Sequence, residues 1–179
     1  MNAAGTISVR QATVADSALL ARLGATTFLD TYTATNTATD MAAYVAGAFG
    51  EDIQRAELSN PRYVALCAER NGAAIGYAML RRGPAHEGVS GFNPLEIARL
   101  YAVQALIGAG VGSALMQRCL DEAASRGHDT IWLAVWEHNP RAIAFYRRWG
   151  FQPVGTQEFT LGHDRQSDHV MMRKVAPEA

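Results

Sequence analysis

Three glycines at alternating positions, Gly108, Gly110 and Gly112, give this sequence its clearest chemical signal. They lie in the string Gly108-Ala109-Gly110-Val111-Gly112-Ser113, between a stretch that favours a strand and one that favours a helix. Glycines let the backbone approach a ligand closely and point successive N–H groups at it. The first turn of the following helix adds unpaired N–H donors and the positive end of its dipole. The string therefore predicts a phosphate site, above all one for a pyrophosphate.

Asn139 and Tyr146 lie two turns apart on a second expected helix and so share one of its faces. Ala142 and Ile143 lie between them on that face, which we expect to point inward. A buried tyrosine needs a partner for its hydroxyl. The sulfur of a thioester, which must be protonated as it leaves, is one such partner. The plain alternatives are that Asn139 only caps the helix and Tyr146 only packs in the core.

A carboxylate, Glu96, is expected in the strand that leads into the glycine-rich string. With strict alternation along the strand, it would share a face with Ala98, Leu100 and Ala102. A carboxylate on a largely apolar face is costly unless the site is wet or functional. An amine nucleophile must lose a proton before or during its attack, and Glu96 could take that proton through water. Otherwise Glu96 is an exposed residue at a frayed strand end.

The other reactive side chains do not indicate a second site. Cys67 and Cys119 lie in apolar segments, which is typical of buried free thiols. The five histidines form no pair with metal-ligand spacing, so no metal is expected. Sixteen Lys and Arg against seventeen Asp and Glu give a net charge of −1. We therefore expect no strong binding to nucleic acid and none to an anionic membrane.

The elements that position these residues follow from hydrophobic periodicity and turn chemistry. Helices are expected to begin at Thr13 to Asp16 and at Thr37 to Asp40, and to cover residues 52–58, 111–126 and 139–150. The dipeptide Asn71-Gly72 signals a hairpin. Strands are expected over residues 6–10, 62–68, 73–82, 95–103, 130–135, 151–159 and 169–175. This order predicts an α/β (α+β) fold, a mixed sheet with helices on both faces.

The length of 179 residues fits one domain spanning residues 1–179. No run of 18 or more apolar residues occurs, so a membrane-spanning helix is not expected. Residues 1–10 lack the charged and apolar regions of a secretory signal. We therefore expect a cytoplasmic protein.

Taken together, these segments resemble the GNAT acetyltransferase superfamily over nearly the whole chain. Residues 95–113 resemble the strand and pyrophosphate loop of that family, which is usually written Gln/Arg-x-x-Gly-x-Gly/Ala. Residues 139–151 match its second cofactor motif, N-x-x-A-x-x-F-Y-x-x-x-G-F, without a gap. Two positions depart from the pattern: Ile107 replaces the usual Gln or Arg, and Gln104 replaces a common proline. One side-chain contact to phosphate is therefore expected to be missing.

The resemblance implies a GNAT fold with six to seven strands, in which two parallel strands splay apart around the pantetheine arm of acetyl-CoA. These strands would be residues 95–103 and 130–135, and Tyr146 would contact the sulfur. Direct transfer within a ternary complex is implied, with a backbone N–H near Tyr101 or Ala102 at the developing oxyanion. The remaining acetyl-CoA contacts would come from Leu100, Tyr101, Ala102, Gly108, Ala109, Gly110, Val111, Gly112, Ser113 and Asn139.

Within the superfamily, the chain looks most like the bacterial spermidine/spermine acetyltransferases. The matching segments are Thr27-Phe28-x-Asp30-Thr31-Tyr32, residues 57–61, residues 131–137 and Gly162-x-Asp164-x-Gln166-x-Asp168. This likeness implies a polyamine acceptor that contacts Phe28, Asp30 and Tyr32. Asp30, Asp40, Glu87 and Glu96 could line an acidic pocket for it, or all of them except Glu96 could be solvated surface residues. The expected partner is thus a small-molecule amine, and a homodimer is an option that the sequence leaves open.

Three alternatives stay open from the sequence alone. The acceptor could be a peptide N-terminus or an amino acid, or the chain could bind CoA as a regulatory module without turnover. The G-x-G-x-G string also begins methyltransferase and dinucleotide folds, and Glu137 could then bind a ribose. Against this last alternative, the string comes late, and too little chain follows it for a doubly wound sheet.

Overall fold

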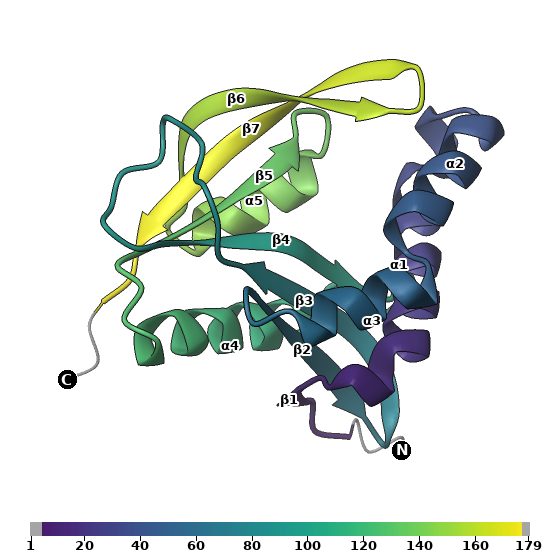
Figure 1. Ribbon diagram of the computed structural model, residues 1–179, viewed down its shortest axis with the longest axis horizontal. Helices are drawn as coiled ribbons and strands as arrows, with labels where there is room; N and C mark the ends of the chain where they lie inside the picture. The colour runs from purple at the N-terminus through teal and green to yellow at the C-terminus, as the bar shows by residue number, and fades with distance from the viewer. Residues whose placement is uncertain (1–4, 177–179) are drawn as a thin grey trace.

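The computed structural model describes residues 5–176, which form a seven-stranded sheet with strand order β1-β2-β3-β4-β5-β7-β6 (Figure 1). The strands are β1 (Ser8–Gln11), β2 (Tyr63–Arg70), β3 (Ala73–Arg81), β4 (Pro94–Ala102), β5 (Thr130–Trp136), β6 (Gln152–Leu161) and β7 (Asp164–Lys174). The helices are α1 (Ser17–Tyr32), α2 (Ala38–Ala48), α3 (Glu51–Ser59), α4 (Val111–Ser125) and α5 (Pro140–Arg148). The predicted fold class and the predicted order of these elements are confirmed.

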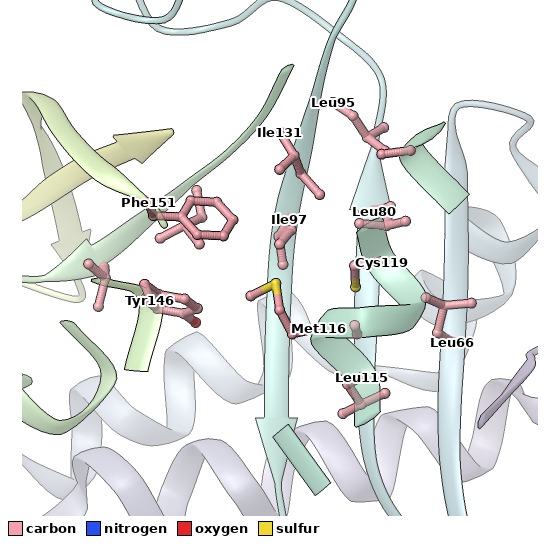
Figure 2. Packing of buried hydrophobic residues seen from close by; sticks show 14 of the residues in the cluster. Leu66, Leu80, Leu95, Ile97, Leu115, Met116, Cys119, Ile131, Tyr146 and Phe151 are labelled. Carbon is pink, nitrogen blue, oxygen red and sulfur yellow. The ribbon is translucent and has the colours of Figure 1, made fainter. Parts of the chain in front are cut away.

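The sheet carries helices on both faces because its strands alternate apolar side chains between two cores. Along β2, Val64 and Leu66 belong to the cluster that α4 and α5 complete, whereas Ala65 and Cys67 belong to the cluster beneath α1. Figure 2 shows the first cluster, in which Leu115, Met116 and Cys119 of α4 lie over the central strands. Within residues 5–176, no helix is long and apolar enough to cross a membrane.

Local turn and cap signals position the helices as the sequence predicts. Asn71 and Gly72 both have positive φ, 53° and 77°, and close the hairpin between β2 and β3. The Thr37 side chain accepts a hydrogen bond from the Asp40 N–H and caps α2. The Asn139 side chain accepts one from the Ala142 N–H and caps α5, which begins at Pro140.

A bulge in β4 corrects the predicted alternation of this strand. Met79 pairs with Arg99 and Leu80 with Ile97, so Ala98 is an extra residue without a partner on β3. Consequently Leu95, Ile97, Leu100 and Ala102 all pack against the cluster that contains α4. Glu96 therefore does not share a face with Leu100 and Ala102, as strict alternation would require; it lies on the opposite face, with Arg99 and Tyr101.

The parallel strands β4 and β5 pair over only three positions, from Pro94 to Glu96 opposite Thr130 to Trp132. Beyond these positions β5 keeps pairing with β7 on its other side, up to Trp136 opposite Asp168. The carboxyl halves of β4 and β5 thus separate, as the predicted splayed pair requires.

The C-terminal hairpin is longer than the sequence pattern predicts. Strand β6 ends at Leu161 and strand β7 begins at Asp164. The turn between them contains Gly162, whose φ is 61°. The tip of this hairpin contacts the α1–α2 region, because the His163 N–H donates to the Asp40 carboxylate and the Gln166 side chain donates to Asn36. These contacts place the hairpin beside the open end of the splayed strands.

An ion pair secures α3 to β4 next to the bulge. The Arg99 guanidinium donates two hydrogen bonds to the Glu57 carboxylate, at 2.6 and 3.0 Å, and lies 5.4 Å from the centre of the Phe49 ring. Both charged side chains are only 15–16% exposed. Removing one charge from such a pair leaves the other desolvated and uncompensated.

We expect Glu57→Gln to lower the free energy of unfolding by about 3 kcal/mol, the cost of breaking a largely buried pair. The matched control is Glu51→Gln on the same helix, where an exposed pair with Arg55 should be worth less than about 1 kcal/mol. Urea denaturation of both variants and the parent measures these changes. Equal losses in the two variants would contradict a structural role for the Glu57–Arg99 pair.

Candidate active site

A cavity of about 770 Å³ occupies the gap between the splayed strands. Its walls come from β4, the glycine-rich loop, the start of α4, β5 and α5, and further out from α1, α2 and the β6–β7 hairpin. The cavity brings together most of the predicted site residues, namely Phe28, Tyr32, Glu96, Leu100, Tyr101, Ala102, Gly108, Gly110, Gly112, Ser113, Asn139 and Tyr146.

The geometry of the glycine-rich loop fits a phosphate group. Gly108 and Gly110 have φ values of 87° and 91°, a region that side chains rarely adopt. A Cβ at Gly108 would meet no atom within 4 Å, and one at Gly110 would meet only Ile7 at 3.9 Å. The space beside this backbone is thus open. Helix α4 begins immediately after Gly110, and no side chain caps it. The first N–H groups of α4 can therefore donate hydrogen bonds to an anion.

Ala109 and Val111 differ from the other loop residues because neither lines the cavity. The Ala109 N–H donates to the Leu106 carbonyl at 3.0 Å, so this donor is used within the loop. The Val111 side chain is buried in the core near Gly76. Both residues hold the shape of the loop, and the donors available to a ligand come from its other positions.

Asn139 and Tyr146 share one face of α5 and both line the cavity, as predicted. Asn139 therefore caps the helix and faces the cavity at once. Tyr146 is only 9% exposed and packs against the rings of Phe145 and Phe151. Burial, with smaller contributions from Tyr32 and Cys119, raises the pKa of Tyr146 well above its usual value. Its hydroxyl therefore stays protonated at neutral pH and can donate a proton into the cavity.

Glu96 lines the same cavity but is held by an ion pair. The Arg81 side chain donates two hydrogen bonds to the Glu96 carboxylate, at 2.7 and 2.9 Å. The Glu96 side chain is 13% exposed. Its two oxygens are thus directed towards Arg81, and water in the cavity is the route by which Glu96 can exchange a proton with a ligand.

The four carboxylates that could have formed an acidic pocket do not lie together, in agreement with the second option that the sequence left open. Asp30 is exposed and lines a smaller neighbouring hollow together with Asn139 and Arg141. Asp40 supports the first turn of α2 and binds His163, and Glu87 is exposed in the loop after β3. Of the four expected carboxylates, only Glu96 lines the main cavity.

Asp168, a buried carboxylate, lines the cavity. The sequence comparison named Asp168 only within a segment that resembles the spermidine/spermine acetyltransferases and did not predict it as a site residue. Asp168 is 8% exposed. Burial, and to a smaller extent the nearby Glu137 carboxylate, raise the pKa of Asp168 to about 6. The alternation Gln166, Asp168, Val170 along β7 places it on an inward face, a signal hidden because the strand begins earlier than predicted.

Two arginines of α5, Arg141 and Arg148, also line the cavity and were not predicted as site residues. Both are exposed, and neither forms an ion pair with another residue in the range 5–176. Arg141 lies two residues after Asn139 and lines the small hollow together with Ile107, the residue that replaces the usual Gln or Arg of the loop. Both arginines occupy variable positions of the α5 motif, so the motif itself gives no signal for them.

No nucleophilic thiol or metal centre is present in the described part of the chain. Cys67 and Cys119 are buried free thiols, and burial raises the pKa of Cys67 to about 11 and that of Cys119 further. Neither lines the cavity. Among residues 5–176, no three His, Cys, Asp or Glu side chains are grouped so that they could hold a metal ion.

Solved structures of similar fold include two that contain CoA or acetyl-CoA. The PaiA N-acetyltransferase of Thermoplasma acidophilum in complex with coenzyme A aligns over 94% of this chain and 99% of its own, with a TM-score of 0.76 and 18% identity. The putative acetyltransferase YncA of Salmonella typhimurium with its cofactor acetyl-CoA aligns over 97% and 96%, with a TM-score of 0.67 and 22% identity. At these identities the likeness shows the fold alone.

Sequence relatives identify the family. An uncharacterized N-acetyltransferase of Mycobacterium tuberculosis is 37% identical over 118 residues, 66% of this chain and 71% of the relative. An uncharacterized N-acetyltransferase of Lactobacillus delbrueckii subsp. lactis is 30% identical over 149 residues, 83% of this chain and 86% of the relative. The family model described as "Acetyltransferase (GNAT) family" matches residues 22–151. This chain therefore belongs to the GNAT family and is an acetyltransferase that uses acetyl-CoA.

Proposed function

We propose that this protein transfers the acetyl group of acetyl-CoA to a primary amine in a ternary complex, and that the amine is a polyamine. The observation that carries the proposal is one continuous cavity that joins the glycine-rich loop, Tyr146 and the carboxylate of Asp168. The phosphate-binding end of the cavity, at the glycine-rich loop, and its acidic end, at Asp168, thus meet at Tyr146, whose hydroxyl can protonate a leaving thiolate.

The chain offers a complete set of groups for holding acetyl-CoA. The glycine-rich loop and the first turn of α4 would bind the pyrophosphate. The free edge of β4, from Leu100 to Ala102, would pair with the pantetheine arm as an added strand would. Arg141 would supply the phosphate contact that Ile107 cannot make. When bound, acetyl-CoA supplies a thioester that an amine can attack.

Positioning and proton transfer would then be the main tasks of the protein. Tyr146, protonated at neutral pH, would donate a proton to the departing sulfur. Glu96 would receive the proton of the amine through water, while Arg81 holds the carboxylate in place. A covalent acyl-enzyme is not part of the proposal, because Cys67 and Cys119 lie outside the cavity with raised pKa values.

The test of the proposal is release of free CoA thiol with a panel of amines. We expect thiol release with spermidine and with simple alkylamines at mildly alkaline pH, where more of each amine is neutral. Faster turnover of a peptide α-amine or an amino acid would replace the polyamine while keeping the enzyme class. Binding of acetyl-CoA without thiol release from any amine would instead indicate a regulatory CoA-binding module.

Gly110→Ala should weaken acetyl-CoA binding by at least about tenfold, because a Cβ would occupy the open space beside the loop and the loop would lose its positive φ. The same backbone strain, about 1–2 kcal/mol, applies to Gly127→Ala at the other end of α4, where φ is 71°. Isothermal calorimetry with acetyl-CoA compares the two variants. If Gly127→Ala weakens binding as much as Gly110→Ala, the effect is strain and not a ligand contact.

Tyr146→Phe keeps the ring and its packing, so acetyl-CoA affinity should change little. The turnover number kcat should fall by roughly 10²–10⁴-fold if the hydroxyl is the general acid. Steady-state kinetics and calorimetry on the same sample separate these two effects. An unchanged kcat would show that Tyr146 is only a core residue and that water protonates the thiolate.

A further inference from the structure

Asp168 differs from the other carboxylates of the cavity because no side chain pairs with it. Glu96 is held by Arg81, and Glu57 by Arg99, each through two hydrogen bonds. Within residues 5–176, the Asp168 side chain has neither a hydrogen-bond partner nor an ion-pair partner, although the residue is only 8% exposed. A buried charge without a partner is costly, so this carboxylate is suited to a cation that arrives with the substrate.

Aromatic rings form a continuous wall at this end of the cavity. Ring centroids are 5.9 Å apart for Trp136 and Tyr32, 4.6 Å for Tyr32 and Phe28, 4.5 Å for Phe28 and Tyr44, and 5.5 Å for Tyr44 and Phe159. All five rings line the cavity. Aromatic faces attract organic cations and also cover the methylene groups that such cations carry.

A second, more open groove continues outwards from this wall and shares Trp136, Gln157 and Gln166 with the cavity. Its lining includes the carboxylates of Glu137, Glu158 and Asp164 against one guanidinium, Arg165, which pairs with Glu158. The acceptor end is therefore acidic, whereas Arg141 and Arg148 lie on α5. This separation of charge favours a substrate with more than one positive group.

The carboxylate is placed to hold a nitrogen that does not react. The attacking nitrogen must be neutral, and an ion pair with a buried carboxylate would keep it protonated. Asp168 pairs in register with Trp136, whose ring packs against Tyr32, and Tyr146 lines the same cavity from α5. Burial first, and then the Asp168 carboxylate, raise the pKa of Tyr32 to about 12. The charged end would thus lie at Asp168 beside Trp136 and Tyr32, and the reacting end near Tyr146.

We propose that Asp168 and the aromatic wall bind a second, non-reacting ammonium group of the acceptor, so that the enzyme selects diamines and longer polyamines over monoamines. The inference rests on the proposed acetyl transfer and adds the residue that determines acceptor choice. It makes Asp168 a specificity residue, separate from the groups that move protons in the reaction.

The test compares Asp168→Asn with the parent enzyme, using 1,4-diaminobutane and butylamine as acceptors of matched length. For the diamine, KM should rise by about 10–100-fold, because the variant loses hydrogen bonds between charged groups. The turnover number kcat should change less than about threefold. Butylamine kinetics should stay the same. The matched control, Asp121→Asn, changes an exposed aspartate on α4 that does not line the cavity, and should alter neither acceptor.

Two readouts keep the proposal separate from acetyl transfer itself. Calorimetry with the CoA-loaded protein should show binding of 1,4-diaminobutane to the parent and a loss of about 10–100-fold in affinity in Asp168→Asn, whether or not any amine is acetylated. The variant should also melt no lower than the parent at neutral pH without ligand, since it removes an unpaired buried charge.

Three results would overturn the proposal. Equal affinity of the parent and Asp168→Asn for the diamine would remove the site. An equal fall in kcat for diamine and monoamine would make Asp168 a partner of the reacting nitrogen, its general base. A parent enzyme that binds butylamine as tightly as 1,4-diaminobutane would show that the acidic end does not select a second charge.

Discussion

The parting of β4 from β5 is the constraint on which the rest of the structure depends. Two adjacent parallel strands normally satisfy each other's backbone groups, yet here they do so at only three positions. Beyond Glu96, the N–H and C=O groups of β4 that face β5 need water or a ligand as hydrogen-bond partners. The extra residue at Ala98 and the continued pairing of β5 with β7 keep the strands apart, so the gap is built into the backbone.

The same gap explains why the residues of the proposed site come from so many elements. Tyr146 and Asn139 reach it from α5, Glu96 from β4, and the glycine-rich loop closes its end at the start of α4. Each of these elements is held by ordinary core packing against the sheet (Figure 2). The site therefore needs little strain beyond the positive φ angles of Gly108 and Gly110.

Sequence patterns predicted the features that local chemistry determines. The cap at Asn139, the hairpin at Asn71-Gly72 and the open glycine-rich loop each depend on a few neighbouring residues, and all three were correct. The bulge at Ala98 depends on pairing with β3, which alternation within β4 cannot show. Asp168 and Asp30 illustrate the same limit. Both lie in segments that resemble the polyamine enzymes, but only the folded sheet shows that Asp168 is buried in the cavity while Asp30 faces solvent. The roles of all these residues stay predictions.

The contact between the hairpin tip and the α1–α2 region divides the molecule in a way that bears on its evolution. His163 with Asp40, and Gln166 with Asn36, join the two segments that line the end of the cavity proposed for the acceptor, and neither segment contributes to the glycine-rich loop. Substitutions, insertions or altered lengths in these two segments can reshape that end while the sheet, α4 and α5 stay as they are. A lineage can thus change the amine it modifies through coordinated drift in two peripheral segments, and inherit its acyl donor unchanged.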